Sequence, residues 1–390
     1  MLNAALVIAA VWLPVRVAAR HVDSALSTIP TVALSVIIAS IGSLPFYTAS
    51  LMPDIYAPIG ILVIAGLTVF ARQMTRWEIL LSCVLGCLAV TAHLTHLATA
   101  LVSIPVVALV SWMFGRTKWW LAPLLIAGVT VFGFAELSTY RVAVKAKTDL
   151  EAVFMPFLTA RLIEDQVGYD YLERHCPDPA IVTCDLYDAL QNSDEPLRLT
   201  ASHILFKTTP EQGSFLHLNE DTRKRISEEQ VTFVRAVLFE MPFRVVGAFL
   251  VNTFNQARMN SVDMTLSTTT KITNLDGVGG LAFGAFRDAA MTQDISWLGS
   301  ANKIHNALYI VSLAVIAVMV LWPGALPAQI RAFTILILLG ILANAFLCGG
   351  LSQPATRYGA RVIWLLPLAA SLCVLHSTFL VDRRQSRAAR

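Results

Sequence analysis

Several windows of about 20 residues contain no charged side chain, and this is the length that an α-helix needs to cross the hydrocarbon core of a bilayer. Of the 390 residues, 56% are hydrophobic and only 14% are charged, and the mean hydropathy is +0.64. Soluble domains are closer to roughly a quarter charged. The sequence therefore predicts an all-α, polytopic membrane protein. It contains no internal repeat, no low-complexity tract and no nucleotide-binding or nucleic-acid-binding motif.

We expect nine membrane segments. In chain order they cover about 2–15, 30–48, 56–71, 78–92, 97–114, 119–137, 307–322, 332–348 and 362–381. The acidic residues fall mostly in the long interval between the sixth and seventh segments. All 26 except Asp23, Asp54, Glu78, Glu136 and Asp382 lie between residues 138 and 303, where the net charge is about −5. We therefore expect three regions: membrane helices in 1–137, an insertion in 138–304, and membrane helices with a basic tail in 305–390.

Lys and Arg in the short connections predict the orientation, because these residues concentrate on the cytoplasmic side of a membrane. One side holds eleven of them: Arg16, Arg20, Arg72, Arg76, Arg116, Lys118, Arg331, Arg383, Arg384, Arg387 and Arg390. The opposite short connections hold only Arg357 and Arg361. This bias predicts a protein of the bacterial inner membrane, with its C-terminus in the cytoplasm and the insertion in the periplasm.

The same orientation puts the N-terminus outside, although no helix is present to carry it there. The first segment is also short, and it lacks the basic n-region of a signal peptide. Either the chain inserts unaided with its N-terminus outside, or a helix precedes Met1 in the natural protein. We favour the second explanation.

The insertion is expected to be mainly helical and to contain a disulfide. Cys176 and Cys184 lie close together in the sequence, and an oxidising compartment favours their oxidation, with two free thiols as the alternative. The stretch "SEEQVTFVRAVLFEMP" begins with a capping-box pattern at Ser227 and ends at Pro242. The following "FRVVGAFLVNTFNQARM" is apolar enough to lie along the membrane surface or against the helical bundle.

One carboxylate, Asp54, lies between two long apolar runs in "SLPFYTASLMPDIYAPIG". One explanation is helix capping, because an acidic residue stabilises the positive N-terminal end of the helix that follows. The other is a general base or a metal-binding carboxylate in an extracytoplasmic cavity at membrane level.

The stretch "AHLTHL" places His93 and His96 on one helix face, at the same outer boundary as Asp54. Two imidazoles on one face suit a metal ion, a phosphate or a proton relay. The alternative is a pair of interfacial histidines that form hydrogen bonds with neighbouring helices. The pattern lacks the glutamate of a zinc-protease helix, so the metal requirement stays open.

Arg357 and Arg361, in "QPATRYGARVIWLLP", oppose the charge bias that otherwise sorts the connections. They share a face if the helix extends through both of them. Two guanidinium groups at the outer membrane surface suit a phosphate or pyrophosphate headgroup. Alternatively, one of them pairs with an acidic residue of the insertion and holds that region in place.

Two of these stretches resemble motifs of GT-C-type membrane glycosyltransferases. "LMPDIYAPIGILVIAGL" resembles the second acidic motif of that family, and "RYGARVIWLLPL" is similar to the Arg-Tyr…Pro segment that opens a terminal helix in several members. Such enzymes are multi-helix proteins with an extracytoplasmic active site. They usually begin with a helix and an outer loop carrying a catalytic Asp or Glu, which this sequence lacks. The arrangement also resembles bacterial inner-membrane proteins of unassigned function.

The resemblance implies glycosyl transfer from a polyprenyl-phosphate-linked sugar. Asp54, His93 and His96 would be catalytic, and Arg357, Tyr358 and Arg361 would bind the phosphate. The expected partners are a lipid-linked sugar or lipid phosphate and membrane lipids, without nucleic acid. A divalent cation is the one cofactor considered. A transporter or flippase for an anionic lipid, and a non-catalytic envelope scaffold, stay open as alternatives.

Overall fold

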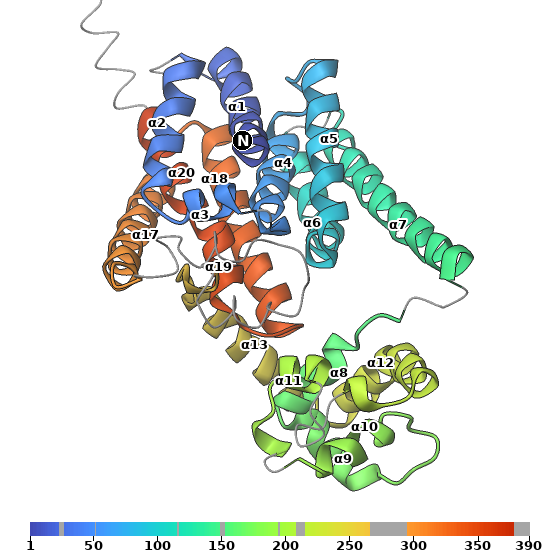
Figure 1. Ribbon diagram of the computed structural model, residues 1–390. Coiled ribbons are helices and arrows are strands. Elements are labelled where there is room, and N and C mark those ends of the chain that lie inside the picture. Colours follow the sequence, from blue (N-terminus) through green and yellow to red (C-terminus); the bar gives the residue numbers. More distant parts are fainter. Residues whose placement is uncertain are drawn as a thin grey trace, which may run out of the picture. The chain divides into compact units, whose positions relative to one another are not determined.

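A computed structural model describes residues 1–22, 27–50, 52–114, 117–148, 153–193, 196–207, 215–265 and 295–377 (Figure 1). Within these ranges the chain is all-helical and has no β-strand. It forms two compact units. Unit 1 comprises Met1–Glu136, Met259–Asn344 and Thr356–Arg390, and unit 2 comprises Leu137–Arg258 and Ala345–Ala355. That residues 138–304 form an insertion on the extracytoplasmic side of the membrane stays a prediction.

Unit 1 contains the apolar helices. They are α1 (Leu2–His21), α2 (Thr28–Ser40), α3 (Leu44–Ala49), the 3₁₀ turn η1 (Pro53–Ile55), α4 (Tyr56–Phe70), α5 (Arg76–Ala92), α6 (Leu94–Phe114), most of α7 (Leu121–Thr148), the turn η5 (Asp263–Thr265), α17 (Leu298–Leu321), α18 (Ala328–Ala345), α19 (Thr356–Ile363) and α20 (Leu365–Leu375). The basic C-terminal tail used for the orientation lies outside the described residues.

Seven helical stretches among the described residues are long and apolar enough to cross a membrane. They are Leu2–His21, Pro53–Phe70, Leu94–Phe114, Leu121–Thr148, Leu298–Leu321, Ala328–Gly350 and Thr356–Leu375. The other two of the nine predicted segments form shorter helices. α5 has 17 residues, and the predicted segment 30–48 is divided between α2 and α3.

At the break between α2 and α3, Ser43 bonds to two helices that are distant in sequence. The backbone N–H of Ser43 donates to the Tyr309 hydroxyl at 2.9 Å, and the Ser43 hydroxyl donates to the Ala360 carbonyl at 2.6 Å. These bonds take Ser43 out of the helical hydrogen-bond pattern. These two hydrogen bonds could not be predicted from the apolar segment 30–48, which contains no charged residue.

Burial separates the helices of unit 1 into central and peripheral ones. In the Pro53–Phe70 stretch 78% of the apolar window is buried, and in Thr356–Leu375 83% is buried. In Leu94–Phe114 and Leu298–Leu321 the share is only 22%. The helices α4, α19 and α20 therefore form the core, and the peripheral helices expose apolar side chains, as expected for a surface that faces lipid.

Glu78 joins α1 to the start of α5. Its carboxylate accepts from the backbone N–H of Thr75, and the Thr75 hydroxyl accepts from the N–H of Glu78, which forms a capping box. The same carboxylate forms ion pairs with Arg16 at 3.1 Å and Arg20 at 2.6 Å, both on α1. Arg16 and Arg20, which belong to the eleven basic residues predicted on the cytoplasmic side, thus lie together at the start of α5.

Gly340 allows α18 to pack closely on α4. A Cβ at this position would lie 2.6 Å from Cγ2 of Ile61, a β-branched side chain that has little freedom to rotate in a helix. By contrast, a Cβ at Gly128 on α7 would meet nothing within 4 Å.

We therefore predict that Gly340→Ala separates α18 from α4 and costs about 1–3 kcal/mol in the free energy of unfolding. Gly128→Ala adds the same methyl group in open space and should be neutral or slightly stabilising, because alanine favours helix over glycine. Thermal melting of both variants in the same detergent tests this. Equal melting temperatures would contradict the packing described here.

Unit 2 consists of helices of 6 to 21 residues and short turns around a core of its own. They are α8 (Phe157–Glu164), α9 (Val167–His175), α10 (Cys184–Gln191), the turn η2 (Pro196–Arg198), α11 (Ala201–Phe206), the turn η4 (Phe215–His217), α12 (Glu220–Glu240), α13 (Pro242–Arg258) and the π-helical turn η6 (Phe346–Gly350). The helix predicted from Ser227 begins earlier, because Asn219 caps α12 by accepting from the N–H of Thr222.

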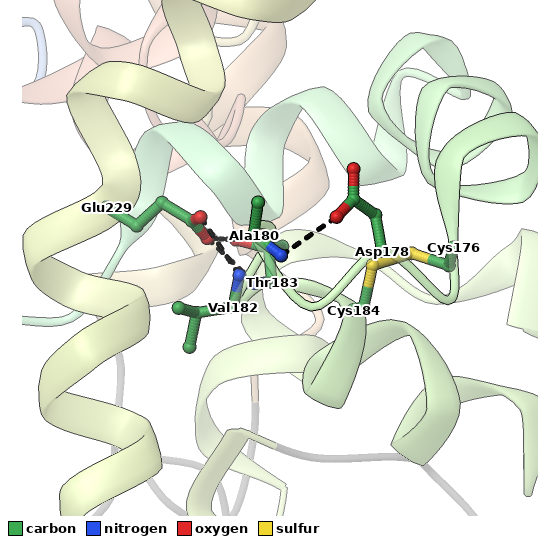
Figure 2. Close-up of a disulfide and its surroundings, with 7 residues drawn as sticks. All are labelled: Cys176, Asp178, Ala180, Val182, Thr183, Cys184 and Glu229. Atoms are coloured by element: carbon green, nitrogen blue, oxygen red, sulfur yellow. Dashed lines mark hydrogen bonds between the residues drawn. A yellow bond between two sulfur atoms is a disulfide. The ribbon is translucent and has the colours of Figure 1, made fainter.

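The predicted disulfide between Cys176 and Cys184 is confirmed, with the two Cα atoms 5.7 Å apart (Figure 2). The bonded loop is held by two carboxylates. Glu229 of α12 accepts from the backbone N–H groups of Val182 and Thr183 and from the Thr183 hydroxyl. Asp178 accepts from the N–H of Ala180. The disulfide thus closes this loop, and Glu229 fastens it to α12.

Candidate functional site

The candidate site is organised around Asp54, at the start of α4. Asp54 lies in the first turn of η1, but its Oδ2 has no hydrogen-bond partner that would cap a helix. Its Oδ1 instead accepts from Arg361 of α19 at 3.0 Å, and both side chains are only 1% exposed. A salt bridge inside an apolar bundle thus joins two stretches of the chain that are far apart in sequence.

The other donors of Arg361 are also engaged. Its Nε and Nη2 donate to Oδ1 of Asn344 at 3.3 and 2.9 Å, and Nη2 also approaches the Thr95 hydroxyl at 3.4 Å. The amide of Asn344 in turn donates to the Tyr358 carbonyl at 2.8 Å. Asn344 lies on α18 and Thr95 on α6, so Arg361 ties these two helices to α19 and α4.

Arg357 lies on the other side of the Asp54 carboxylate. Its Nη2 is 3.7 Å from Oδ2 of Asp54, too far for a hydrogen bond, and its side chain is 28% exposed. Neither Oδ2 of Asp54 nor Nε of Arg357 has a hydrogen-bond partner, although both atoms are buried. The backbone of Arg357 is fixed, because its carbonyl accepts from the Tyr47 hydroxyl at 2.8 Å. This half of the cluster therefore has unused capacity to bind a ligand.

Tyr358 connects the two arginines. Its ring lies 5.1 Å from the guanidinium carbon of Arg357 and 4.9 Å from that of Arg361. Both distances are in the range of cation–π interactions. Three positions predicted from one stretch, Arg357, Tyr358 and Arg361, are thus brought together with Asp54. Among the described residues, the acidic partner of Arg357 is Asp54 and not a residue of the predicted insertion.

His93 is placed in the turn between α5 and α6, and its ring joins the cluster through Thr95. The Nδ1 atom of His93 accepts from the backbone N–H of Thr95 at 3.1 Å and lies 2.9 Å from the Thr95 hydroxyl. The Thr95 hydroxyl can therefore donate to His93 while it accepts from Arg361. Burial, and secondarily the charge of Arg361, lowers the pKa of His93 to about 4.

His96 points to a different environment. Its Nδ1 bonds to the Ala89 carbonyl at 3.0 Å, which requires a proton on Nδ1 and leaves Nε2 as an acceptor. That Nε2 is buried without a hydrogen-bond partner, beside an apolar cavity of about 20 Å³ between α4, α5, α6 and α7. A cavity of this size holds about one water molecule. The two rings are 5.5 Å apart but use their nitrogens differently.

The cluster does not favour a divalent cation. Among the described residues, no group of three or more His, Cys, Asp and Glu side chains is placed to hold a metal ion. Asp54 has a guanidinium beside each carboxylate oxygen, and these two positive charges would repel a bound cation. The arrangement suits an anion next to Arg357 better.

Sequence reasoning missed three members of the cluster: Asn344, Thr95 and Tyr47. They are uncharged residues in or beside apolar helices, so the search for charges could not find them. An asparagine near the end of an apolar helix is a signal that could have been used, because a buried amide needs hydrogen-bond partners.

Comparison of the chain with models of protein families, with characterised proteins and with solved structures finds no match. The function is therefore argued from the cluster itself and from the resemblance of its motifs.

We predict that Asp54→Asn and Arg361→Gln each cost about 3–5 kcal/mol, because each leaves a buried charge without its partner. The double variant should cost less than the sum of the two, since no unpaired charge remains. Arg357→Gln should cost less than either, because its guanidinium is partly exposed. Unfolding in detergent measures all four. If Arg361→Gln were no worse than Arg357→Gln, the central role of the buried pair would be wrong.

A second prediction concerns pH. His93 has an ordinary pKa near 6.5 when unfolded and about 4 when folded, so acid favours the unfolded state. The stability that the neutral ring provides is present above pH 6.5 and is lost as the pH falls towards 4. Between pH 7 and 4.5 the parent chain should lose about 2 kcal/mol more than His93→Gln. If the free energy of unfolding falls equally in the parent chain and in His93→Gln, the neutral ring of His93 does not contribute to stability.

Proposed function

We propose that this chain is a membrane glycosyltransferase that uses a polyprenyl-phosphate-linked sugar donor at the extracytoplasmic face of the bacterial inner membrane. The observation that carries the proposal is Arg357, whose side chain is partly exposed and lies beside a buried carboxylate. Its Nε has no partner, so it can donate to a phosphate oxygen without breaking a hydrogen bond. The donor class comes from the GT-C-like motifs that contain Asp54 and Arg357.

The topology proposed with this function has nine spans, with α2 and α5 as the two short ones. It requires the connections that carry Asp54, His93 and Arg357 to lie on one side of the membrane. The meeting of all three at one cluster supports this. The pairing of Arg16 and Arg20 with Glu78, at the opposite end of α5 from His93, supports a cytoplasmic face there.

The reaction joins an acceptor hydroxyl oxygen to the anomeric carbon of the sugar and breaks the bond between that carbon and the lipid phosphate. The electron pair of the broken bond goes to the phosphate, and the hydroxyl proton passes to Oδ2 of Asp54, which releases it to water. Arg357 stabilises the charge that develops on the departing phosphate. Oδ2 of Asp54, an acceptor without a hydrogen-bond partner, orients the attacking hydroxyl by accepting its proton in a hydrogen bond.

The remaining predicted residues have positioning roles in this proposal. The donors of Arg361 are engaged by Asp54 and Asn344, so its role is to hold the Asp54 carboxylate in place. Tyr358 keeps the two guanidinium groups apart through its ring. His93 maintains Thr95 next to Arg361, and His96 lines an apolar cavity to which Asn344 of the cluster also contributes. The proposal assigns no step to a metal ion.

The first test is binding of undecaprenyl phosphate to the purified full chain. Loss of one charge-assisted interaction in Arg357→Ala should weaken binding by about ten- to a hundredfold. The matched control is Arg76→Ala, which removes an exposed guanidinium from the predicted cytoplasmic end. It should leave binding unchanged. Equal weakening in both variants, or no binding by the parent chain, would overturn the phosphate site.

The second test is chemical turnover. Incubation with lipid-linked sugar donors and candidate acceptors should release lipid phosphate and form a glycosidic bond, and Arg357→Lys should reduce the rate because lysine lacks the planar fork of arginine. Movement of the lipid across vesicles without bond formation would identify a transporter instead. Binding without either activity would favour a scaffold.

A further inference from the structure

α13 of unit 2 (gold in Figure 1) is an amphipathic helix whose apolar side is uncovered. Phe243, Val246, Leu250 and Phe254 lie on one face at helical spacing, and Phe243, Leu250 and Phe254 are 91%, 61% and 62% exposed. Phe239, at the end of α12, is 73% exposed and precedes this face along the chain. Exposed aromatic and aliphatic residues in a continuous row are unusual in water and mark an interaction surface.

The opposite face of α13 is fixed against the end of a candidate membrane span. Gly349 lies in η6, which ends the apolar stretch Ala328–Gly350, and a Cβ there would be 2.6 Å from both the Asn252 carbonyl oxygen and Cβ of Gln256. The side-chain amide of Gln256 also donates to the Ala355 carbonyl at 3.0 Å and accepts from the Ala355 N–H at 2.9 Å. α13 is thus bonded to the connection that follows this span.

That connection determines the depth of α13. The apolar stretches Ala328–Gly350 and Thr356–Leu375 are separated only by the short connection that ends at Ala355. If both stretches cross the membrane, the connection has to lie at its surface, and the helix that is bonded to it lies there as well. Asn252, one turn before Gln256 on the same face of α13, donates from its amide to both oxygens of Asp165 at 2.9 and 3.0 Å.

The charges of α13 agree with a lipid surface. The helix contains no Asp or Glu; of its two basic residues, Arg244 pairs with Asp170 at 2.7 Å, and Arg258 lies at the C-terminal end. The guanidinium carbon of Arg258 lies 5.3 Å from the ring of Phe254, and that of Arg235 lies 5.4 Å from the ring of Phe239. Arginines beside an apolar face can extend their charged ends to lipid phosphates while the face is buried in the acyl region.

We infer that α13 is an interfacial helix, whose face of Phe243, Val246, Leu250 and Phe254 is embedded in the lipid surface of the membrane that the chain spans. This inference does not depend on the proposed transferase activity. It gives the predicted insertion a second attachment to the bilayer, besides the covalent connections to the spans. Helices of this kind bury their apolar face by about 5–10 Å at the boundary of headgroups and acyl chains.

The test is the depth of nitroxide labels on the full chain in lipid bilayers. Single cysteines replace Leu250 and Phe254, and matched controls replace Asn255, which is exposed on the flank of α13, and Asp188, which is exposed on α10. The background carries alanine at the four free cysteines, Cys83, Cys87, Cys348 and Cys373. Its melting temperature is compared with that of the parent chain before labelling.

We expect labels at 250 and 254 to collide readily with oxygen and poorly with a water-soluble nickel chelate, at a depth of about 5–10 Å below the phosphates. Labels at 255 and 188 should show the opposite preference. Ready collision of nickel with 250 and 254 would place the face in water and overturn the inference. Protection from both reagents would also overturn it, because the face would then be covered by protein, such as a second copy of this chain.

Discussion

The arrangement of the helices in unit 1 depends on one buried ion pair, between Asp54 and Arg361. Both groups lose their hydration inside an apolar bundle, and their attraction offsets this cost only because further hydrogen bonds satisfy the guanidinium. Asn344 and Thr95 provide those bonds. The pair therefore requires the start of α4, the end of α18, the start of α6 and α19 to meet at one place, and this meeting creates the candidate site.

A buried ion pair is weak evidence for stability, since apolar residues of similar volume often serve as well. Arg357 suggests why a charged pair, rather than apolar residues, occupies this place in the bundle. Arg357 shares the carboxylate of Asp54 but stands farther from it and is partly exposed. Arg361 keeps the carboxylate in place and neutralises it, and Arg357 can turn to an external anion at little cost. In the proposed function, such a site would bind a phosphate and would not be left with an isolated buried charge when empty.

Sequence reasoning found the elements that have a strong periodic or compositional signal and missed the ones decided by contacts. The uncharged runs predicted apolar helices, and the spacing of Cys176 and Cys184 in an oxidising compartment predicted the disulfide. Arg357 and Arg361 were conspicuous because they oppose the charge bias. Their common partner could not be predicted, because Asp54 is distant in sequence. The interruption at Ser43 depends on hydroxyl contacts with two other helices, which no local pattern encodes.

The most direct test of this account is an experimental structure of the full chain in a bilayer with undecaprenyl phosphate bound. The account predicts that the phosphate contacts the guanidinium of Arg357 and that the pair between Asp54 and Arg361 stays intact, with Asn344 still bonded to Arg361. A phosphate bound to Arg361 with Asp54 released would contradict the division of roles. A lipid phosphate located away from both arginines would contradict the site itself.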